Sequence, residues 1–486
     1  MHDMMTIVKS YIENLFLAKG ISISNNRIQL FEEFIQNTIN QQVVSTIVEQ
    51  QQYLMGVWKI KNRIADIIDL HVPVPNATAG KPYEAKIDLE QLGLQDIVST
   101  TWQGLEEIGL QFNKDSDTIE GTPVQSGEFK VRLLFKIEED ADEESIKTLS
   151  LIVNADPKTL WKNLPSDPEA IFWKEDDVSA FAPLGEKHIV AASNRGRSHE
   201  NVGSFRDDDF AFRHLEKTGW SVVAVADGAG SYYLSRKGAQ LACHSVVNYF
   251  ENHLEQGAFH LLEDQLIAYE KSKDENLFKD AEILSKQNLY KAVLFVHNQI
   301  KALAEETQRS NPELFVSSKA KAPADYFHAT LIFALFKKFD FGYVIMTFGV
   351  GDCPIAVMNR EQSGTTLLNW LDVGEFGGGT RFVTQPDIFH SKEHPMASRF
   401  NLKIIPDFSY LFLMTDGIYD PKFVVEANLE KHEKWVEFVA DLQGKNENNA
   451  RVDFSAANEE IAGQLTAWMD FWSTGNHDDR TLAIIF

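Results

Sequence analysis

The sequence predicts a multidomain protein in which a layered α/β domain follows a small β-sandwich and a helical N-terminal segment. Three changes of residue pattern along the 486 residues support this prediction. Residues 1–75 repeat apolar side chains at helical spacing, and residues 76–155 alternate them with polar ones. Residues 185–486 contain short apolar runs separated by helical stretches, which is typical of a mixed α/β domain.

The N-terminal segment, residues 1–75, is predicted to be helical and to carry no chemistry. Ile28, Phe31, Ile35 and Ile39 recur at helical spacing, and a similar pattern returns over residues 53–67. The glutamines and asparagines between them make a polar surface without strong charge. We expect a small helical bundle or extension and, over residues 1–180, a surface on which a protein partner docks.

Residues 76–155 are predicted to form strands. Val131, Leu133 and Phe135 alternate with charged residues. The strip Ile119-x-Gly121-Thr122-Pro123, followed by Gly127-x-Phe129, resembles the putative immunoglobulin-like repeats of multidomain bacterial proteins. That resemblance implies a small β-sandwich used for spacing or binding. Residues 156–184 contain several prolines and an acidic run, which predicts a linker.

Three apolar runs of the C-terminal region end in an aspartate. Residues 222–226 precede Asp227 and Gly228, residues 410–415 precede Asp416, and residues 348–351 precede Asp352. An Asp-Gly pair alone is an ordinary turn, but its ordered recurrence at strand ends is not. Carboxylates that converge there repel one another unless cations lie between them, and hard oxygen ligands favour Mg²⁺ or Mn²⁺.

Composition excludes several classes of function. The net charge of −25 argues against a nucleic-acid surface, which needs clustered Lys and Arg. The two cysteines are too few for a disulfide framework or a cysteine-ligated zinc site. There is no uninterrupted apolar run of about 18 residues, and the N-terminus does not resemble a signal peptide. We therefore expect a cytoplasmic protein without a membrane span.

Taken together and in order, the motifs of residues 185–486 resemble the protein phosphatase 2C family of metal-dependent serine/threonine phosphatases, and more narrowly a bacterial branch of it. The resemblance implies an α-β-β-α sandwich and hydrolysis of phosphoserine and phosphothreonine on proteins by a metal-activated water at a two-metal site. The motifs are Ser193–Phe212, Val225–Ser231, Phe348–Asp352, Gly374–Phe382, Met414–Asp420 and His477–Leu482.

The resemblance also implies roles for individual residues. Two Mn²⁺ or Mg²⁺ ions are expected, with Asp352 contributing to a third, weaker site. Asp208 stands where many members have glutamate and implies a contact through water. The remaining expected ligands are Asp209, Asp227 as the bridging carboxylate, the Gly228 carbonyl, Asp416 and Asp478.

Two roles depart from the family pattern. The expected phosphate-binding arginine is missing near Ser204, and Arg197 and Arg206 are both available substitutes. The histidine that some members use as general acid is replaced by Ala229, and His199 is the candidate in its place. An alternative function stays open: a phosphatase-like domain that binds metal or ligand and signals with little turnover. A further one makes residues 1–180 the main module and the phosphatase domain an accessory.

Overall fold

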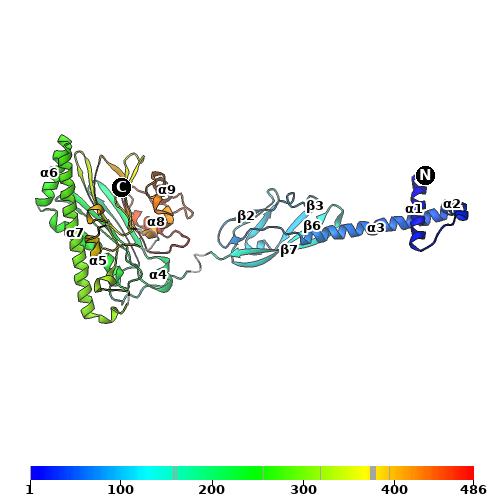
Figure 1. Ribbon diagram of the computed structural model, residues 1–486, viewed down its shortest axis with the longest axis horizontal. Helices are drawn as coiled ribbons and strands as arrows, with labels where there is room; N and C mark the ends of the chain where they lie inside the picture. Colours follow the sequence, from blue (N-terminus) through cyan, green and yellow to red (C-terminus); the bar gives the residue numbers. More distant parts are fainter. Residues whose placement is uncertain are drawn as a thin grey trace. The chain divides into compact units, whose positions relative to one another are not determined.

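The computed structural model describes residues 2–156, 159, 161–255, 257–317, 319–372, 379–392 and 394–486 (Figure 1). The chain divides into two compact units, Met1–Leu160 and Trp161–Phe486. Part of the strip Gly374–Phe382, residues 374–378, lies outside the described residues.

The first unit begins with the expected helices. They are α1 (His2–Ala18), α2 (Ile28–Gln36) and α3 (Thr38–Asp69). Asn37 caps α3, because its side chain accepts hydrogen bonds from the backbone N–H groups of the next turn. Buried apolar residues of the three helices form one small core, made of Val8, Ile12, Phe31, Ile35 and Val44.

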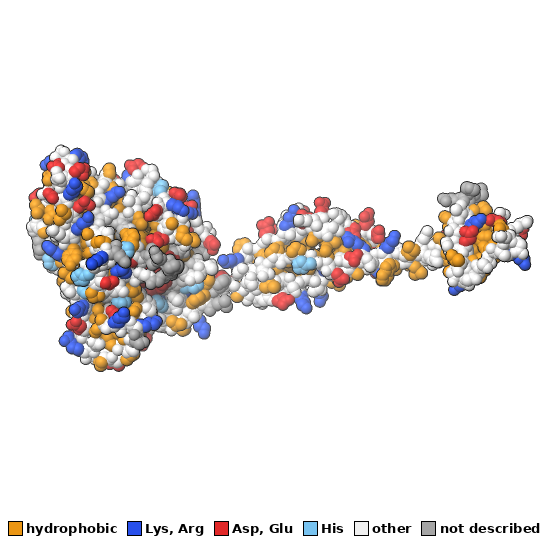
Figure 2. Space-filling model, in the orientation of Figure 1, with side chains coloured by type: hydrophobic (Ala, Val, Ile, Leu, Met, Phe, Trp, Pro, Cys, Tyr) orange, Lys and Arg blue, Asp and Glu red, His pale blue; other side chains and the backbone are white. Residues whose placement is uncertain are grey.

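Helix α3 continues well beyond that core. Its last turn packs beside β7 (Asp140–Asn154), where the buried Lys147 ammonium donates to the carbonyls of Ile68 and Leu70. A cation at the C-terminus of a helix also complements the helix dipole. Val44 and Ile67 are the buried residues of α3, so the turns between them expose apolar side chains (Figure 2).

Residues 77–154 form two sheets around a shared apolar core. Gly121 shows why the recognised strip needs glycine. Its φ is +139°, and a Cβ there would lie 2.5 Å from the Gly109 carbonyl oxygen. One sheet has the order β1-β7-β6-β3 and the other β2-β5-β4, with bounds β1 (Ala77–Thr78), β2 (Tyr83–Lys86), β3 (Ile97–Gln103), β4 (Leu110–Asn113), β5 (Thr118–Gly121) and β6 (Gly127–Ile137).

The second unit contains two antiparallel sheets. The five-stranded sheet has the order β10-β11-β12-β13-β16, and the six-stranded sheet has the order β15-β14-β17-β18-β9-β8. The strands are β8 (Asp177–Leu184), β9 (Lys187–Asn194), β10 (Asp209–Leu215), β11 (Trp220–Ala226), β12 (Leu331–Phe339), β13 (Gly342–Val350), β14 (Ile355–Asn359), β15 (Thr365–Leu367), β16 (Phe400–Ile405), β17 (Phe408–Met414) and β18 (Arg480–Ile485).

Most helices of this unit pack apolar side chains against the sheets. The helices are α4 (Arg197–Val202), α5 (Ser235–His253), α6 (Gly257–Ser272), α7 (Glu275–Ser310), α8 (Asp416–Phe423), α9 (His432–Leu442) and α10 (Ile461–Met469). This confirms the predicted mixed α/β content.

Strand β11 shows how the sequence builds the core. Val222 and Ala224 belong to a cluster that includes α5 and α7, whereas Val223 and Val225 belong to a cluster shared by strands of both sheets. Successive side chains of a strand point to opposite faces, so an apolar run without alternation is buried on both sides. A third cluster joins β17 and β18 to α8, α9 and α10.

The predicted linker over residues 156–184 is wrong in its last eight residues. Asp177–Leu184 is β8, which pairs with β9 along its whole length at the edge of the six-stranded sheet. An edge strand tolerates Pro183, because one side of it needs no ladder hydrogen bonds. The strand was not predicted because the prolines and the acidic run before it are typical of a linker.

This strand changes the expected boundary of the second unit. A fragment starting at Trp161 should fold and should melt at the same temperature as this unit does in the whole chain. A fragment starting at Gly185 loses β8, and its melting temperature should fall by at least about 10 °C, or it should not fold at all. Thermal melts of both fragments check this, and equal melting temperatures would show that β8 is dispensable.

Candidate active site

Five aspartates converge at the ends of strands from both sheets. Asp208 directly precedes β10 and Asp227 directly follows β11; these strands pair with Asp209 opposite Ala226, which brings the two carboxylates together. Asp352 follows β13, Asp416 begins α8 after β17, and Asp478 lies just before β18. The folded sheets therefore collect carboxylates that are far apart in sequence.

The convergence makes these carboxylates costly to ionise. Burial, and then repulsion from neighbouring aspartates, raises the pKa of Asp227 and Asp416 well above the usual range. Burial, followed by repulsion from Asp479 and Asp478, raises the pKa of Asp208 to about 7. Among the described residues, no Lys, Arg or His forms an ion pair with any of the five. Within the described ranges, the cluster is therefore not neutralised by an ion pair with a protein side chain.

The donor set fits hard divalent cations. Asp352 accepts a 2.7 Å hydrogen bond from Thr380 through Oδ2, but its buried Oδ1 has no hydrogen-bond partner among the described residues. Ligand atoms of Asp227, Asp352 and Cys353 lie within 4.8 Å of one another. Burial raises the pKa of the Cys353 thiol well above its usual value, so the oxygens remain the ligands suited to Mg²⁺ or Mn²⁺.

Asp208 is fixed within the cluster. Its Oδ2 accepts hydrogen bonds from the hydroxyls of Thr415 and Thr481, at 2.8 and 2.9 Å. These threonines flank Asp416 and Asp478 in the chain, so the same loops that carry two aspartates hold a third. Gly228 belongs to this framework, since a Cβ there would lie 2.6 Å from the Asp207 carbonyl oxygen.

The structure does not bring Asp209 into the cluster, contrary to the expected ligand set. Asp209 accepts from the Lys174 ammonium at 3.0 Å and lies 3.9 Å from Arg206. Burial opposes its ionisation, but Lys174 and then Arg206 outweigh that effect and lower its pKa. Adjacent residues at a strand start face opposite sides, so Asp208 and Asp209 cannot both face the cluster.

Lys174 is a site residue that the sequence prediction missed. It is 7% exposed, and besides Asp209 its ammonium donates to the Asp208 carbonyl at 2.5 Å. Burial lowers its pKa despite the neighbouring carboxylates. Lys174 therefore positions the backbone that carries Asp208. A lone lysine before an acidic run gave no signal of this role.

The two arginines proposed to bind phosphate are used elsewhere. Arg206 is 2% exposed and donates to Glu175, Ser193 and the Asp208 carbonyl. Arg197 is ion-paired with Asp470 and lies 5.8 Å from the Trp472 ring. Both bonding patterns tie structural segments together, so neither arginine is placed to hold a phosphoryl group.

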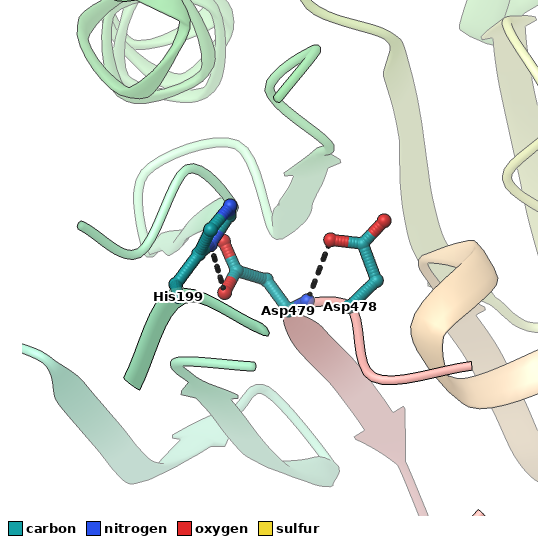
Figure 3. A group of neighbouring side chains, drawn as sticks. All are labelled: His199, Asp478 and Asp479. Atoms are coloured by element: carbon teal, nitrogen blue, oxygen red, sulfur yellow. Dashed lines mark hydrogen bonds and ion pairs between the residues drawn. The ribbon is translucent and has the colours of Figure 1, made fainter. Parts of the chain in front are cut away.

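His199 lies beside the cluster, paired with Asp479 (Figure 3). Its Nδ1 is 3.0 Å from Asp479, and its Nε2 is 3.9 Å from Asp207. Burial opposes protonation, but Asp479, Asp207 and Asp478 together raise the His199 pKa to about 9. The imidazole is therefore protonated at neutral pH and can donate a proton.

Asp479 is a second site residue, and the sequence prediction gave it no role. It accepts backbone hydrogen bonds from Gly196 and Asp207, and it pairs with His199. The protein phosphatase 2C motif that His477–Leu482 resembles has asparagine at this position. The extra carboxylate was visible in the sequence, and a buried acid calls for a nearby cation, which His199 supplies.

Replacing Asp479 with asparagine should move the pH dependence of turnover. Without the carboxylate, the raised pKa of His199 falls toward the ordinary histidine value near 6.5. If His199 acts as an acid, activity is lost as pH rises through its pKa. The alkaline limb of the pH–rate profile should therefore lie near pH 9 in the native protein and at least about one unit lower in Asp479→Asn. An unmoved limb would contradict this role.

Among the described residues, no helix combines the length and apolar character needed to cross a membrane.

The chain was compared with solved structures, with curated proteins and with models of protein families. Solved structures similar to this chain include the catalytic domain of the serine/threonine protein phosphatase PstP in complex with two manganese ions, at 14% identity and TM-score 0.35, covering 64% of this chain and 98% of that one. Another is Stp1 from Staphylococcus aureus, at 13% identity and TM-score 0.31, covering 66% and 98%. A comparison with curated proteins found no match.

The sequence model of the family described as protein phosphatase 2C matches residues 195–466. The match covers more than half of the chain and includes the segments that carry Asp208, Asp227, Asp352 and Asp416. The chain therefore belongs to the protein phosphatase 2C family.

Proposed function

We propose that residues 161–486 hydrolyse phosphoserine and phosphothreonine monoesters of proteins, with Mn²⁺ or Mg²⁺ as cofactor. The observation that carries this proposal is the convergence of five aspartates, none of which forms an ion pair among the described residues. Asp208 is buried, Asp227, Asp352 and Asp416 are half-buried, and Asp478 is exposed. Asp208, Asp227, Asp352, Asp416 and Asp478, with the Gly228 carbonyl, would hold the cations. When bound, such cations make water available as a nucleophile near neutral pH and neutralise phosphoryl oxygens.

The protein's own residues supply the remaining parts of the reaction. His199, protonated through its pairing with Asp479, donates a proton to the leaving serine or threonine oxygen. Lys174 and the threonines Thr415 and Thr481 keep Asp208 in place. No nucleophilic side chain is needed, which agrees with the buried thiol of Cys353 staying protonated.

One observation favours a second candidate, a phosphatase-like module that binds cations but turns over slowly. Arg197 and Arg206 are committed to structural contacts, so the phosphoryl group must be held without either of them. Retention of the carboxylate cluster favours the enzyme. If the domain is an enzyme, the cations and His199 would neutralise the negative charge of the phosphoryl group that an arginine would otherwise neutralise.

Hydrolysis of matched phosphopeptides separates the two candidates. The full chain with Mn²⁺ should release phosphate from peptides carrying phosphoserine or phosphothreonine, and more slowly from the phosphotyrosine peptide of the same sequence. The control is Asp227→Asn under identical conditions, which should release none. Binding of Mn²⁺ without hydrolysis of any peptide would favour the signalling module.

The proposal extends to the rest of the chain in a coarser way. We place the catalytic unit in an α-β-β-α sandwich, preceded by a β-sandwich over residues 76–155, in a cytoplasmic protein. Residues 1–180 would offer a docking surface that selects phosphoprotein substrates, since remote contacts matter for large substrates and not for small aryl phosphates.

A further inference from the structure

The middle of α3 is a helical span that the described residues of its own unit, Met1–Leu160, do not support. Between Val44, which joins the helical core, and Ile67, which joins the β-sheet region, the helix buries no residue. An isolated helix is marginal in water, and Gly56 weakens this one further, because glycine costs roughly 1 kcal/mol in a helix interior. Something outside this unit is expected to stabilise the span.

The span exposes large apolar side chains. Leu54, Met55 and Trp58 are 66%, 61% and 69% exposed, and no charged residue stands between Glu49 and Lys59. Apolar side chains of this size are seldom left in water together. The absence of charge also means that no electrostatic pattern excludes an identical helix.

The spacing of these residues is that of a two-helix seam. Alternating steps of four and three residues define one face of α3, as in a coiled coil. The faces used inside the chain are different ones, since Val44 and Val48 contact the helical core and Ile60, Ile64 and Ile67 contact the β-sheet region. The seam consists of Ile47, Gln51, Leu54, Trp58, Lys61 and Ala65.

We propose that α3 pairs with α3 of a second copy of this chain, in antiparallel orientation, through this seam. In an antiparallel pair the sum of paired residue numbers is constant, so Leu54 packs against Trp58 of the partner subunit. The same register places Gln51 beside Lys61 of the partner subunit and Ile47 beside Ala65 of the partner subunit. Leu54 then packs against a flat indole ring, and Ile47 packs against a small side chain.

A parallel pair would be much poorer. It would place the two Lys61 ammonium groups opposite each other and stack the two Trp58 rings at one level. Like charges at a seam are unfavourable. The antiparallel pair avoids both clashes and gives a twofold interface in which each surface contacts its own copy, which is the commonest form of homodimer.

The area is sufficient for an association of moderate strength. An aromatic side chain buries roughly 150–250 Å² and Leu or Met somewhat less, so the seam offers on the order of 450 Å² per copy and about 900–1,000 Å² per pair. That is near the lower end of specific interfaces.

Light scattering on the full chain tests the pairing. The native protein at tens of micromolar should have twice the 55.1 kDa mass of one chain. Leu54→Glu should raise the dissociation constant at least about 100-fold and give single chains. Gly56→Ala is the matched control: Gly56 lies on the opposite face, where an added Cβ meets nothing within 4 Å, so this variant should stay dimeric. Aryl phosphate turnover should be unchanged in both, and the helix content measured by circular dichroism should equal that of the native protein, which shows that α3 still folds.

Cross-linking tests the orientation. The native cysteines Cys243 and Cys353 are buried, so any disulfide between chains can be assigned to the introduced cysteines. A mixture of Gln51→Cys and Lys61→Cys chains should form a disulfide dimer on oxidation, while either variant alone should not, since like positions lie about 15 Å apart along the helices. A monomeric native protein, which would leave the seam to a different protein, overturns the proposal. So does a disulfide in Gln51→Cys alone, which would indicate a parallel pair.

Discussion

Removal of divalent cations with EDTA should abolish turnover of any phosphomonoester, and added Mn²⁺ or Mg²⁺ should restore it. The reason is electrostatic: burial and mutual repulsion raise the pKa values of the clustered aspartates, and the described residues offer them no ion pair. In the proposed reaction, water would be available as a nucleophile near neutral pH only when bound cations lower its pKa. The expected loss is at least about 1,000-fold in kcat.

Two controls make the metal experiment specific. Calcium should restore activity poorly, because it prefers longer bonds and more ligands than Mg²⁺. The melting temperature should fall in EDTA and recover with Mn²⁺, since a ligand that binds only the folded state stabilises it. Full turnover after exhaustive dialysis against EDTA would exclude the proposed site altogether.

Substitution of two adjacent aspartates should have opposite consequences. Asp208→Asn should lower kcat by about 100-fold or more with a small change in melting temperature, because it removes a negative ligand from the cation cluster. Asp209→Asn should leave kcat within about tenfold but lower the stability by about 3 kcal/mol, since it leaves the buried Lys174 unpaired. The two variants are isosteric with the native residues and differ by one position.

Kinetics and thermal melts of the same two preparations decide the assignment. Asp227→Asn serves as the reference for a lost ligand and should resemble Asp208→Asn. Loss of turnover in Asp209→Asn, together with an active Asp208→Asn, would restore the assignment that the sequence motif suggested and contradict the geometry.

Much of the catalytic unit could be predicted from sequence, because its main features are local. An apolar run without alternation, followed by Asp227 or Asp416, specifies a buried strand and a carboxylate at its end. The family motifs follow these positions, so the sequence predicts which aspartates gather at the strand ends, and their binding of cations stays a prediction. The local sequence does not determine whether Asp208 or Asp209 joins the aspartate cluster. That depends on the residue at which β10 begins to pair with β11.

The remaining errors share a physical cause. Whether a charged side chain serves the site or the scaffold depends on partners distant in sequence. By sequence position Arg206 could bind phosphate, but in the structure its guanidinium donates to Ser193 and to the Asp208 carbonyl. Lys174 looked like part of a linker because β8, which fixes its segment, begins after an acidic run and contains a proline. Neither fact is present in a short window of residues.

The four residues before and at the start of β18 have a consequence for tolerated variation. Asp478 faces the cation cluster and Asp479 pairs with His199. Arg480 donates to the carbonyls of Met469 and Phe471, just after α10, and Thr481 bonds Asp208. Each neighbour is different, so substitutions here fail for different reasons: lost cation binding, a shifted pH profile, an unanchored helix end or a displaced ligand. We therefore expect that substitution at any of these four positions impairs activity or stability.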